Sequence, residues 1–293
     1  SGSQQALDYI GKLFLSPHDT ALVAWPTYMG ALGAFNAYEP EYDRLTPNAN
    51  RAAADYRARA EARGGQVKFA YMSVDLRARQ NMLALAEALD IAIVEDAAYQ
   101  ALRYDGAAVP PILALEVAQK GSIEAARTLY CGSFSKTLAP GLRVGWVCAA
   151  KPVIAKLVLL KQASDLHSPT LNQMAIADVA EKQFDTHTAS IRAAYMSRRD
   201  AMLAALATYR PGAVEWTRPE GGMFVWLTLP VGLDGADLLA LSLKTQRVAF
   251  VPGAAFFADG SGRNTIRLSF SRTDEATITE GIKRLGQVLK AAV

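Results

Sequence analysis

The sequence contains very few residues that bind metals or form disulfides. Its 293 residues include two cysteines, Cys131 and Cys148, and three histidines, His18, His167 and His187. No two of these residues have the spacing of a metal site. Both cysteines stand in apolar segments, which favours buried free thiols in a reducing compartment over a disulfide framework. We therefore expect the protein in the cytoplasm.

Long apolar runs and blocks of a single charge are also absent. No apolar run is as long as a membrane span, and the opening residues, SGSQQALDYIG, have neither the basic nor the apolar part of a signal peptide. The formal net charge is +3 at pH 7. Its lysines and arginines are spread along the chain, so no cluster is suited to following a phosphate backbone. These residues indicate neither a membrane nor a nucleic acid as a partner.

What the sequence does contain is an alternation of short apolar runs with helical patterns. The runs are ALVAW (21–25), VKFAYM (67–72), IAIVED (91–96), TLYCGSF (128–134) and VGWVCAA (144–150). Buried strands that alternate with helices predict an α/β fold, with a mostly parallel sheet covered by helices on both faces. Ligands of such sheets bind at the carboxyl ends of the strands. Asp96 and the segment 133–136 are expected at that edge.

The second part of the chain has a different pattern. A long helical stretch, from about Asp178 to Tyr209, leads into short strand-like segments and a final helix over 273–293. We therefore expect a large α/β domain over residues 1–180 and a smaller α+β domain over residues 181–293. Near the start, Ser3 precedes apolar residues at helical spacing, which predicts that it caps the first helix.

The segment CGSFSKTLAPGLRVGW, residues 131–146, gathers groups that suit a phosphate and a reactive amine. Lys136 becomes a nucleophile when it loses its proton, which burial or a neighbouring cation favours. Ser133, Ser135 and Arg143 could bind a phosphate together with the N-terminus of a helix. A lysine beside a phosphate site is typical of pyridoxal 5′-phosphate, which we expect as the cofactor.

Two further residues complete this interpretation. The ring nitrogen of the cofactor needs an anionic partner, and Asp96 follows a very apolar strand. Tyr99 could donate to the ring hydroxyl. Each feature alone has a simpler explanation, and only their joint occurrence in this order favours a cofactor site. Lys136 could be a solvated surface lysine, and Asp96 could be a helix cap. Tyr28 and Tyr99 could be core aromatic residues. Arg267 could form an ion pair, and Gly221–Gly222 could form a hairpin turn.

Six motifs in order carry a family resemblance. They are GSQQALD (2–8), WPTY (25–28), EDAAY (95–99), SFSKTLAPGLRVG (133–145), PEGGMFVW (219–226) and IRLSFS (266–271). With them the chain resembles the fold-type I aminotransferases. It is most similar to the group that holds 2-aminoadipate and kynurenine aminotransferases and MocR-like regulators. The resemblance implies a sheet of the seven-stranded type, flanked by helices, with a smaller C-terminal domain.

The resemblance also implies roles for the residues of the larger domain. Lys136 matches the lysine that forms a Schiff base with the cofactor and moves a proton during catalysis. Asp96 matches the partner of the pyridine nitrogen, and Tyr99 matches the phenol that bonds the ring oxygen. Tyr28 matches the aromatic residue stacked on the ring. The residues that match the phosphate site are Ser3, Gln4, Ser133, Ser135 and Arg143.

In the smaller domain, Arg267 matches the arginine that binds the substrate α-carboxylate, which suits a planar bidentate donor. Gly221 and Gly222 match a turn on the substrate side. The implied substrates are an α-amino acid and a 2-oxo acid, and the resemblance implies a homodimer, because subunits of this family share residues across a two-fold axis.

Two segments depart from the family pattern. The resemblance implies a loop with an Asn-Pro-Thr-Gly motif, whose asparagine bonds the ring hydroxyl. Here VKFAYM (67–72) is followed directly by SVDLRARQ (73–80), and a site without that asparagine would be impaired. The segment EYDRLTP (41–47) also has no apolar body where a strand is expected.

Three functions remain open at this point. The first, which we favour, is a transaminase that moves an amino group from an α-amino acid to a 2-oxo acid. The second is the effector-sensing domain of a MocR-type transcriptional regulator. The third is another reaction of the same cofactor, such as β-elimination, because a fold does not determine its chemistry.

Overall fold

The chain forms two compact units. The computed structural model describes residues 2–46, 49–72 and 76–292. One unit comprises Ser1–Ala98 and Ala107–Phe184, and the other comprises Tyr99–Gly106 and Asp185–Val293. The main division therefore falls within a single long helix, α7 (Thr170–Tyr209). The expected domain boundary at residue 180 stays a prediction.

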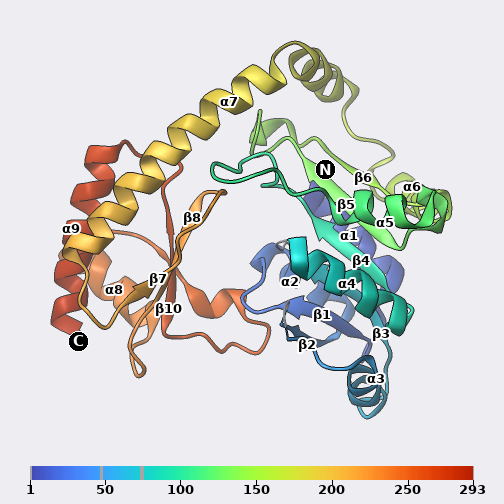
Figure 1. Ribbon diagram of the computed structural model, residues 1–293, viewed down its shortest axis with the longest axis horizontal. Helices are drawn as coiled ribbons and strands as arrows, with labels where there is room; N and C mark the ends of the chain where they lie inside the picture. The colour runs from blue at the N-terminus through green and yellow to red at the C-terminus, as the bar shows by residue number, and fades with distance from the viewer. Residues whose placement is uncertain (1, 47–48, 73–75, 293) are drawn as a thin grey trace. The chain divides into compact units, whose positions relative to one another are not determined.

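The first unit is built on a six-stranded sheet, whose strands are drawn from blue to green in Figure 1. The strands lie in the order β2-β1-β3-β4-β5-β6. All neighbours pair in parallel except β5 and β6, which are antiparallel. This confirms the mostly parallel α/β fold. The strands are β1 (Thr20–Ala24), β2 (Glu41–Leu45), β3 (Val67–Met72), β4 (Ala92–Asp96), β5 (Thr128–Ser133) and β6 (Gly145–Cys148).

The number of strands differs from the expectation. We expected the seven-stranded type, and the described residues contain six strands in this sheet. Five of them arise from the apolar runs, and the sixth, β2, is the polar segment that had no apolar body. In the described residues, β2 is an edge strand that pairs only with β1. Its side chains therefore need not be apolar on both faces, which allows a polar segment to form this strand. The expected Asn-Pro-Thr-Gly position, at residues 73–75, lies outside the described residues.

Helices cover both faces of this sheet. In Figure 1, α4 lies in front of the sheet and α1 lies behind it. Side chains of β3 alternate accordingly: Ala70 and Met72 join the apolar cluster that includes residues of α4, whereas Phe69 and Tyr71 pack against Phe35 of α2. The helices of this unit before α7 are α1 (Ser3–Phe14), α2 (Met29–Phe35), α3 (Ala53–Glu61), α4 (Leu76–Leu89), α5 (Ile112–Lys120) and α6 (Lys151–Asp165).

The beginning of α1 differs from the prediction. Ser3 is the first helical residue, so the prediction that it is the N-cap is wrong. Gly2 holds the cap position with φ 70°, and no side chain bonds the first turn there. Glycine adopts this left-handed conformation without the steric cost that a Cβ brings. The N–H of Gln5 donates to the carbonyl of Gly2 at 3.3 Å, and no side chain at the cap position accepts a bond from the first turn.

The two cysteines are free, but only Cys131 is buried. The expectation of a buried Cys148 is wrong, because β6 is an edge strand with alternating exposure. Cys148 pairs in register with Tyr130, and Cys131 pairs with Val147. The two thiols therefore point to opposite faces of the sheet.

The second unit combines a four-stranded antiparallel sheet with helices. Its sheet order is β7-β8-β10-β9, and its core joins the sheet to the C-terminal helix through Leu227, Ile266 and Leu285. Gly221 and Gly222 do not form a hairpin turn. Instead, Gly221 bridges Arg103, and Gly222 donates its N–H to the carbonyl of Leu102. The elements are β7 (Glu215–Trp216), β8 (Phe224–Thr228), α8 (Gly235–Thr245), β9 (Val251–Pro252), β10 (Thr265–Ser269) and α9 (Glu275–Ala292).

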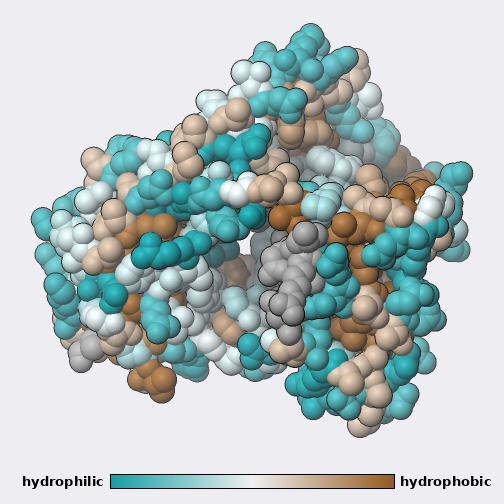
Figure 2. All heavy atoms as spheres, viewed as in Figure 1, coloured by the Kyte–Doolittle hydropathy of each residue, from teal (hydrophilic) through white to brown (hydrophobic). Residues whose placement is uncertain are grey.

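The surface of the protein is mixed in polarity. On the face drawn in Figure 2, hydrophilic residues cover most of the surface and hydrophobic residues form separate patches. Among the residues that the structure describes, none of the helices is both long and apolar enough to span a membrane.

The edge strand β2 is held by a buried carboxylate. Asp43 is 4% exposed and accepts hydrogen bonds from Arg51 Nη1 at 2.5 Å and Arg59 Nε at 2.8 Å. Its Oδ1 also accepts from the backbone N–H of Arg44. Burial by itself would raise the pKa of Asp43, but these three donors outweigh burial and hold the pKa below its ordinary value. The bonds connect β2 to α3 and to the loop before it.

We predict that Asp43→Asn lowers the free energy of unfolding by about 2 kcal/mol at neutral pH, the usual range for hydrogen bonds to a charged group. The lowered pKa means that the folded state binds fewer protons. The contribution is therefore present above the unfolded pKa near 4 and is lost as the pH falls through the folded value. Urea unfolding across this pH range measures it.

The matched control is Asp178→Asn. Asp178 forms an exposed ion pair with Lys182 on α7, and both side chains are 62% exposed. A pair of this kind contributes about 0.5 kcal/mol or less. Equal losses in the two variants would show that burial of Asp43 contributes nothing.

Candidate active site

The predicted site residues of the first unit lie at one edge of its sheet. Asp96 is the last residue of β4, and Ser133 is the last residue of β5. Because β4 and β5 are parallel neighbours, their carboxyl ends meet at the same edge. This is the edge where parallel sheets bind ligands.

Asp96 is held by its neighbours through one of its two oxygens. The phenol of Tyr71 donates a hydrogen bond of 2.7 Å to Asp96 Oδ2, and the backbone N–H of Ala98 also bonds the carboxylate. Asp96 Oδ1 is buried, and no donor within the described residues reaches it. An acceptor without a donor is costly to bury unless a ligand supplies the missing bond.

The environment of Asp96 sets its charge. Burial raises the pKa of Asp96 above its ordinary value, and three interactions partly oppose this: the Tyr71 hydrogen bond, the Ala98 N–H and the positive charge of Lys136. Lys136 therefore lies near enough to Asp96 for its charge to act on the carboxylate.

The loop after β5 forms a cluster of donors. Arg143 Nη1 donates to Ser135 Oγ at 3.2 Å and to the carbonyl of Pro140 at 3.1 Å. The N–H of Ser135 donates to Ser133 Oγ at 3.1 Å. Arg143 itself adopts φ 54°, in the left-handed region, which turns the chain at the end of this loop. A guanidinium beside two hydroxyls is a suitable anion site.

The N-terminus of α1 meets this cluster through two close approaches. A Cβ added to Gly2 would lie 2.9 Å from Arg143 Nη2, and a Cβ added to Gly145 would lie 2.6 Å from the backbone N of Ser3. Glycine at position 145 therefore lets α1 approach β6, and Gly2 lies beside the Arg143 guanidinium. The first N–H groups of a helix attract anions, so this arrangement adds backbone donors to the cluster.

Gln4 and Tyr28 connect α1 to α2. Gln4 Nε2 donates to the carbonyl of Gly30 at 2.5 Å, and Tyr28 OH donates to Gln4 Oε1 at 3.3 Å. The Tyr28 side chain is exposed and lies close to Gly30, where an added Cβ would be 2.5 Å from Tyr28 Cζ. The predicted phosphate residues and Tyr28 are thus linked by contacts around the N-terminus of α1.

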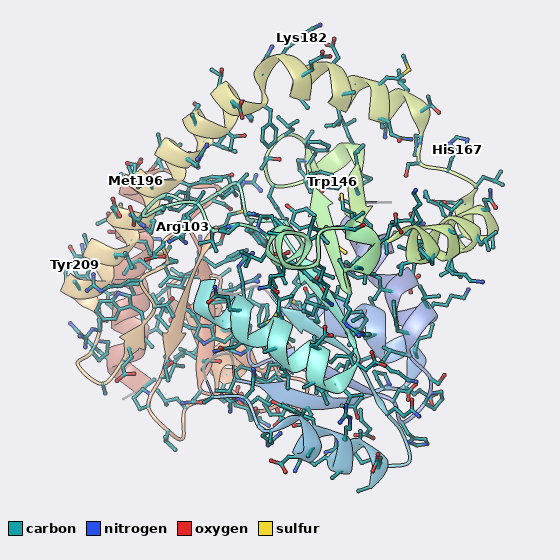
Figure 3. The ribbon with its side chains drawn as sticks, turned by 45° about the vertical axis from the view of Figure 1, so that its right-hand side comes forward. Arg103, Trp146, His167, Lys182, Met196 and Tyr209 are labelled. Atoms are coloured by element: carbon teal, nitrogen blue, oxygen red, sulfur yellow. The ribbon has the colours of Figure 1, made fainter. Side chains whose placement is uncertain are left out.

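Trp146 supports the same loop from β6 (Figure 3). Its indole covers Gly132, where an added Cβ would come within 2.2 Å of the ring, and its centre lies 4.6 Å from that of Phe134. Gly132 is therefore required for this packing. The sequence analysis gave Trp146 no role, because a tryptophan in an apolar run reads as core.

In the second unit, Arg267 is placed between aromatic rings. Arg267 lies on β10, and its Cζ is 3.9 Å from the ring centre of Phe224 and 4.4 Å from that of Phe256. Such cation–π contacts hold a guanidinium while leaving its polar edge for hydrogen bonds. Tyr99 contacts Phe224 edge to face, with the ring centres 6.0 Å apart.

Gly222, the predicted substrate-side glycine, has φ 81°. This conformation favours glycine. Tyr104 donates its hydroxyl hydrogen to the Gly222 carbonyl. Tyr99, Gly222 and Arg267 all belong to the second unit.

Sequence reasoning missed the groups that hold the site residues in place. Tyr71 stands in an apolar run and reads as a core residue. Phe224 and Phe256 stand in the segments MFVW and AAFF, which suggest an apolar pocket or core packing equally well, and the sequence did not indicate their contact with Arg267. The contact between Tyr71 and Asp96 depends on strand register, which a single sequence does not show. Within the described ranges, no group of three or more His, Cys, Asp or Glu residues could hold a metal ion.

Comparisons with known proteins show the family of this chain. The family model "Aminotransferase class I and II" matches residues 73–285. Aromatic-amino-acid aminotransferase 1 of Thermococcus litoralis is 42% identical, covering 99% of this chain and 71% of that protein. The 2-aminoadipate transaminase of Thermus thermophilus is 40% identical, covering 99% of this chain and 74% of that protein.

A solved structure matches the fold over the whole chain. The kynurenine aminotransferase of Pyrococcus horikoshii, crystallised in complex with PMP, superposes with a TM-score of 0.91. It is 39% identical, and the match covers 100% of this chain and 74% of that one.

We predict that Gly145→Ala weakens the binding of pyridoxal 5′-phosphate at least about tenfold and destabilises the protein by about 1–3 kcal/mol, the usual cost of overpacking. The added methyl would meet only backbone atoms of α1 and β5, which cannot move aside as a side chain can. Absorption titration and urea unfolding measure the two effects.

Gly141→Ala is the matched control in the same loop. An added Cβ at Gly141 would have no atom within 4 Å. This variant is expected to bind and unfold as the parent does. If Gly145→Ala also bound the cofactor normally, the close approach of α1 to β6 would not matter for the site.

Proposed function

Because this chain belongs to the class I and II aminotransferases, we propose a role for each residue of its candidate site. The protein transfers an amino group from an α-amino acid to a 2-oxo acid, and its cofactor is pyridoxal 5′-phosphate. The alternative of a regulatory effector domain is not better supported, because the relatives with 42% and 40% identity are named as aminotransferases.

The residues of the first unit fit this cofactor. Asp96 Oδ1 is a buried carboxylate oxygen that no donor of the described chain reaches, and a protonated pyridine nitrogen is a donor of the right charge. The cluster of Ser133, Ser135 and Arg143 at the N-terminus of α1 fits a phosphate. When bound, pyridoxal 5′-phosphate supplies an aldehyde that reacts with amines and a ring that withdraws electrons from the substrate α-carbon.

Lys136 is the covalent and acid–base residue in this proposal. Its Nζ would hold the cofactor, and its amine would accept the proton of the substrate α-carbon and return a proton during the transfer. Asp96 would keep the ring nitrogen protonated. Tyr28 and Tyr99 would contact the ring face and the ring oxygen. Ser3 and Gln4 add the N-terminus of α1 to the phosphate site.

Arg267 binds the substrate α-carboxylate, and Gly222 lines the substrate side. The support for Arg267 is the pair of rings, Phe224 and Phe256, that contact its guanidinium. A planar donor fixed in this way can offer two parallel N–H groups to a carboxylate. The single observation that carries the whole proposal is the buried, unsatisfied oxygen of Asp96 beside Tyr71.

The proposed amino donors are aromatic α-amino acids, with 2-oxoglutarate as the acceptor. The relative from Thermococcus litoralis is named for aromatic amino acids, and aromatic side chains surround Arg267 on the second unit. A second candidate donor is 2-aminoadipate, which the name of the relative from Thermus thermophilus favours.

The proposed assembly is a homodimer in the cytoplasm. Apolar side chains are exposed on α6 and at the beginning of α7, next to a groove of about 400 Å³ that Trp146 lines. A second copy of the chain would bury them. An exposed free thiol at Cys148 favours a reducing compartment. The exposed apolar residues are Val158, Leu159, Leu166, Leu171 and Met174.

We predict that Lys136→Ala abolishes the visible absorption of the covalently held cofactor and lowers kcat by at least about 10³-fold, because both covalent attachment and proton transfer lose their amine. The control is Lys151→Ala, which removes a lysine that is 90% exposed. Absorption spectra and coupled assays with 2-oxoglutarate measure both. An unchanged spectrum in Lys136→Ala would remove this lysine from the mechanism.

We also predict that kcat/KM is at least about tenfold higher for phenylalanine or tyrosine than for alanine, since apolar contact with a large side chain contributes roughly 1–3 kcal/mol. Initial rates with each donor, at saturating 2-oxoglutarate, test this. A higher kcat/KM for 2-aminoadipate than for the aromatic donors would favour the second candidate. No turnover with any donor, despite bound cofactor, would contradict the assignment of Lys136 and Arg267.

A further inference from the structure

Tyr71 is a buried titratable residue that the proposed mechanism does not use. It lies on β3 and is 4% exposed. In register it faces Val94 of β4, and Asp96 follows Val94 by two residues on the same face. The phenol therefore extends along the sheet to its carboxyl edge, where its hydroxyl donates to Asp96 Oδ2 at 2.7 Å.

Packing fixes the position of the phenol. Phe35 of α2 contacts the Tyr71 ring edge to face, with the ring centres 5.7 Å apart. Phe35 also contacts Phe69 of β3 in the same way, at 5.1 Å. The hydroxyl is thus placed by a strand and by a buried aromatic cluster. Hydroxyl groups in such settings hold a hydrogen-bond partner in one orientation.

The surroundings of Tyr71 and Asp96 keep the Tyr71 phenol protonated, so that it donates the hydrogen bond to Asp96. Burial, followed by the charge of Asp96, raises the pKa of Tyr71 well above its ordinary value, so the phenol keeps its proton. Burial also raises the pKa of the Cys131 thiol on β5, which stays neutral beside Asp96. The other facing groups are Tyr28 and the cation of Lys136. Asp96 is therefore the acid in this group that can carry a negative charge.

We propose that Tyr71 is a positioning residue: it holds Oδ2 of Asp96 so that Oδ1 stays ionised and directed to the ring nitrogen of the cofactor. This inference rests on the proposed role of Asp96. Without the Tyr71 hydroxyl, the carboxyl group of Asp96 could rotate. Its pKa would also rise further, because the hydrogen bond that partly offsets the effect of burial would be lost. Tyr71 thereby orients the Asp96 carboxylate toward the cofactor without contacting the cofactor itself.

A double-mutant cycle on the cofactor-free protein tests the pairing. At neutral pH, Tyr71→Phe should raise the unfolding equilibrium constant about thirtyfold in the parent but only about threefold in the Asp96→Asn background, as expected for charged and neutral hydrogen bonds. The ring and its packing are kept in every variant. Equal effects in the two backgrounds would mean that the hydroxyl is merely structural and would overturn the inference.

A matched control removes a different buried hydroxyl. Tyr56 is 1% exposed, and its hydroxyl donates to the carbonyl of Arg44 at 2.9 Å. Tyr56→Phe should therefore have the same effect with Asp or Asn at position 96. Coupling of Tyr56→Phe to Asp96→Asn as large as that of Tyr71→Phe would show that the cycle reports general loosening, and the inference would fail.

The pH dependence gives an independent readout. The pKa of Asp96 is raised, so the folded state binds more protons than the unfolded state, and stability falls as the pH rises through the folded value. In Tyr71→Phe this decline should extend to higher pH. The difference between the variant and the parent should therefore grow from acid to neutral pH. A difference that is constant with pH would contradict the role of Tyr71.

Binding of pyridoxamine 5′-phosphate, which forms no covalent bond with Lys136, separates this inference from the proposed function. We expect both Asp96→Asn and Tyr71→Phe to weaken its binding, the latter about tenfold, measured by fluorescence titration. If Asp96→Asn binds normally, the proposed role of Asp96 fails. If Asp96→Asn binds weakly and Tyr71→Phe binds as the parent does, only the inference about Tyr71 fails.

Discussion

The site depends on keeping one carboxylate charged inside the protein. Removing Asp96 from water is costly, and the sheet offsets that cost with the phenol of Tyr71, the N–H of Ala98 and the nearby charge of Lys136. These groups satisfy one oxygen, whereas the other has no donor in the described chain. The fold therefore holds a buried acceptor, Asp96 Oδ1, that a cationic N–H group of a ligand could bond. In the proposed mechanism, Lys136 can react with the cofactor only when Asp96 holds the ring in place.

Two adjacent acidic residues on β4, Glu95 and Asp96, point to opposite faces of the sheet and have different hydrogen-bond partners. Glu95 points to the face covered by α4 and α5, where it is 2% exposed and pairs with Arg79 and with the N–H of Ile112. Asp96 points to the opposite face, toward Tyr71. Glu95 is satisfied entirely by protein groups and connects the sheet to its helices. Asp96 keeps one oxygen without a donor from the described residues, because alternate side chains meet different neighbours.

The phosphate cluster depends on small residues as much as on charged ones. Gly145 allows α1 to approach β6 at a distance that a side chain would prevent, and Gly2 lies close to the guanidinium of Arg143. The left-handed turn at Arg143 then directs its guanidinium back to Ser135. A helix terminus, a guanidinium and two hydroxyls converge there because the backbone is able to come this close. Such an arrangement suits the proposed phosphate site, because the first N–H groups of a helix attract anions.

The sequence by itself determined the alternation of strands and helices, the carboxyl-edge location of Asp96 and Ser133, and the family, since apolar periodicity and local motifs are properties of neighbouring residues. It did not predict that β2 is a polar edge strand, that Gly2 rather than Ser3 caps α1, or that Cys148 is exposed, because edges and caps depend on what lies beside a segment. Only the tertiary structure decided that Tyr71 meets Asp96 and that Phe224 and Phe256 hold Arg267. Those contacts join segments that are separate in sequence. Strand register, which sets the contacts between strands, follows from packing of the whole sheet.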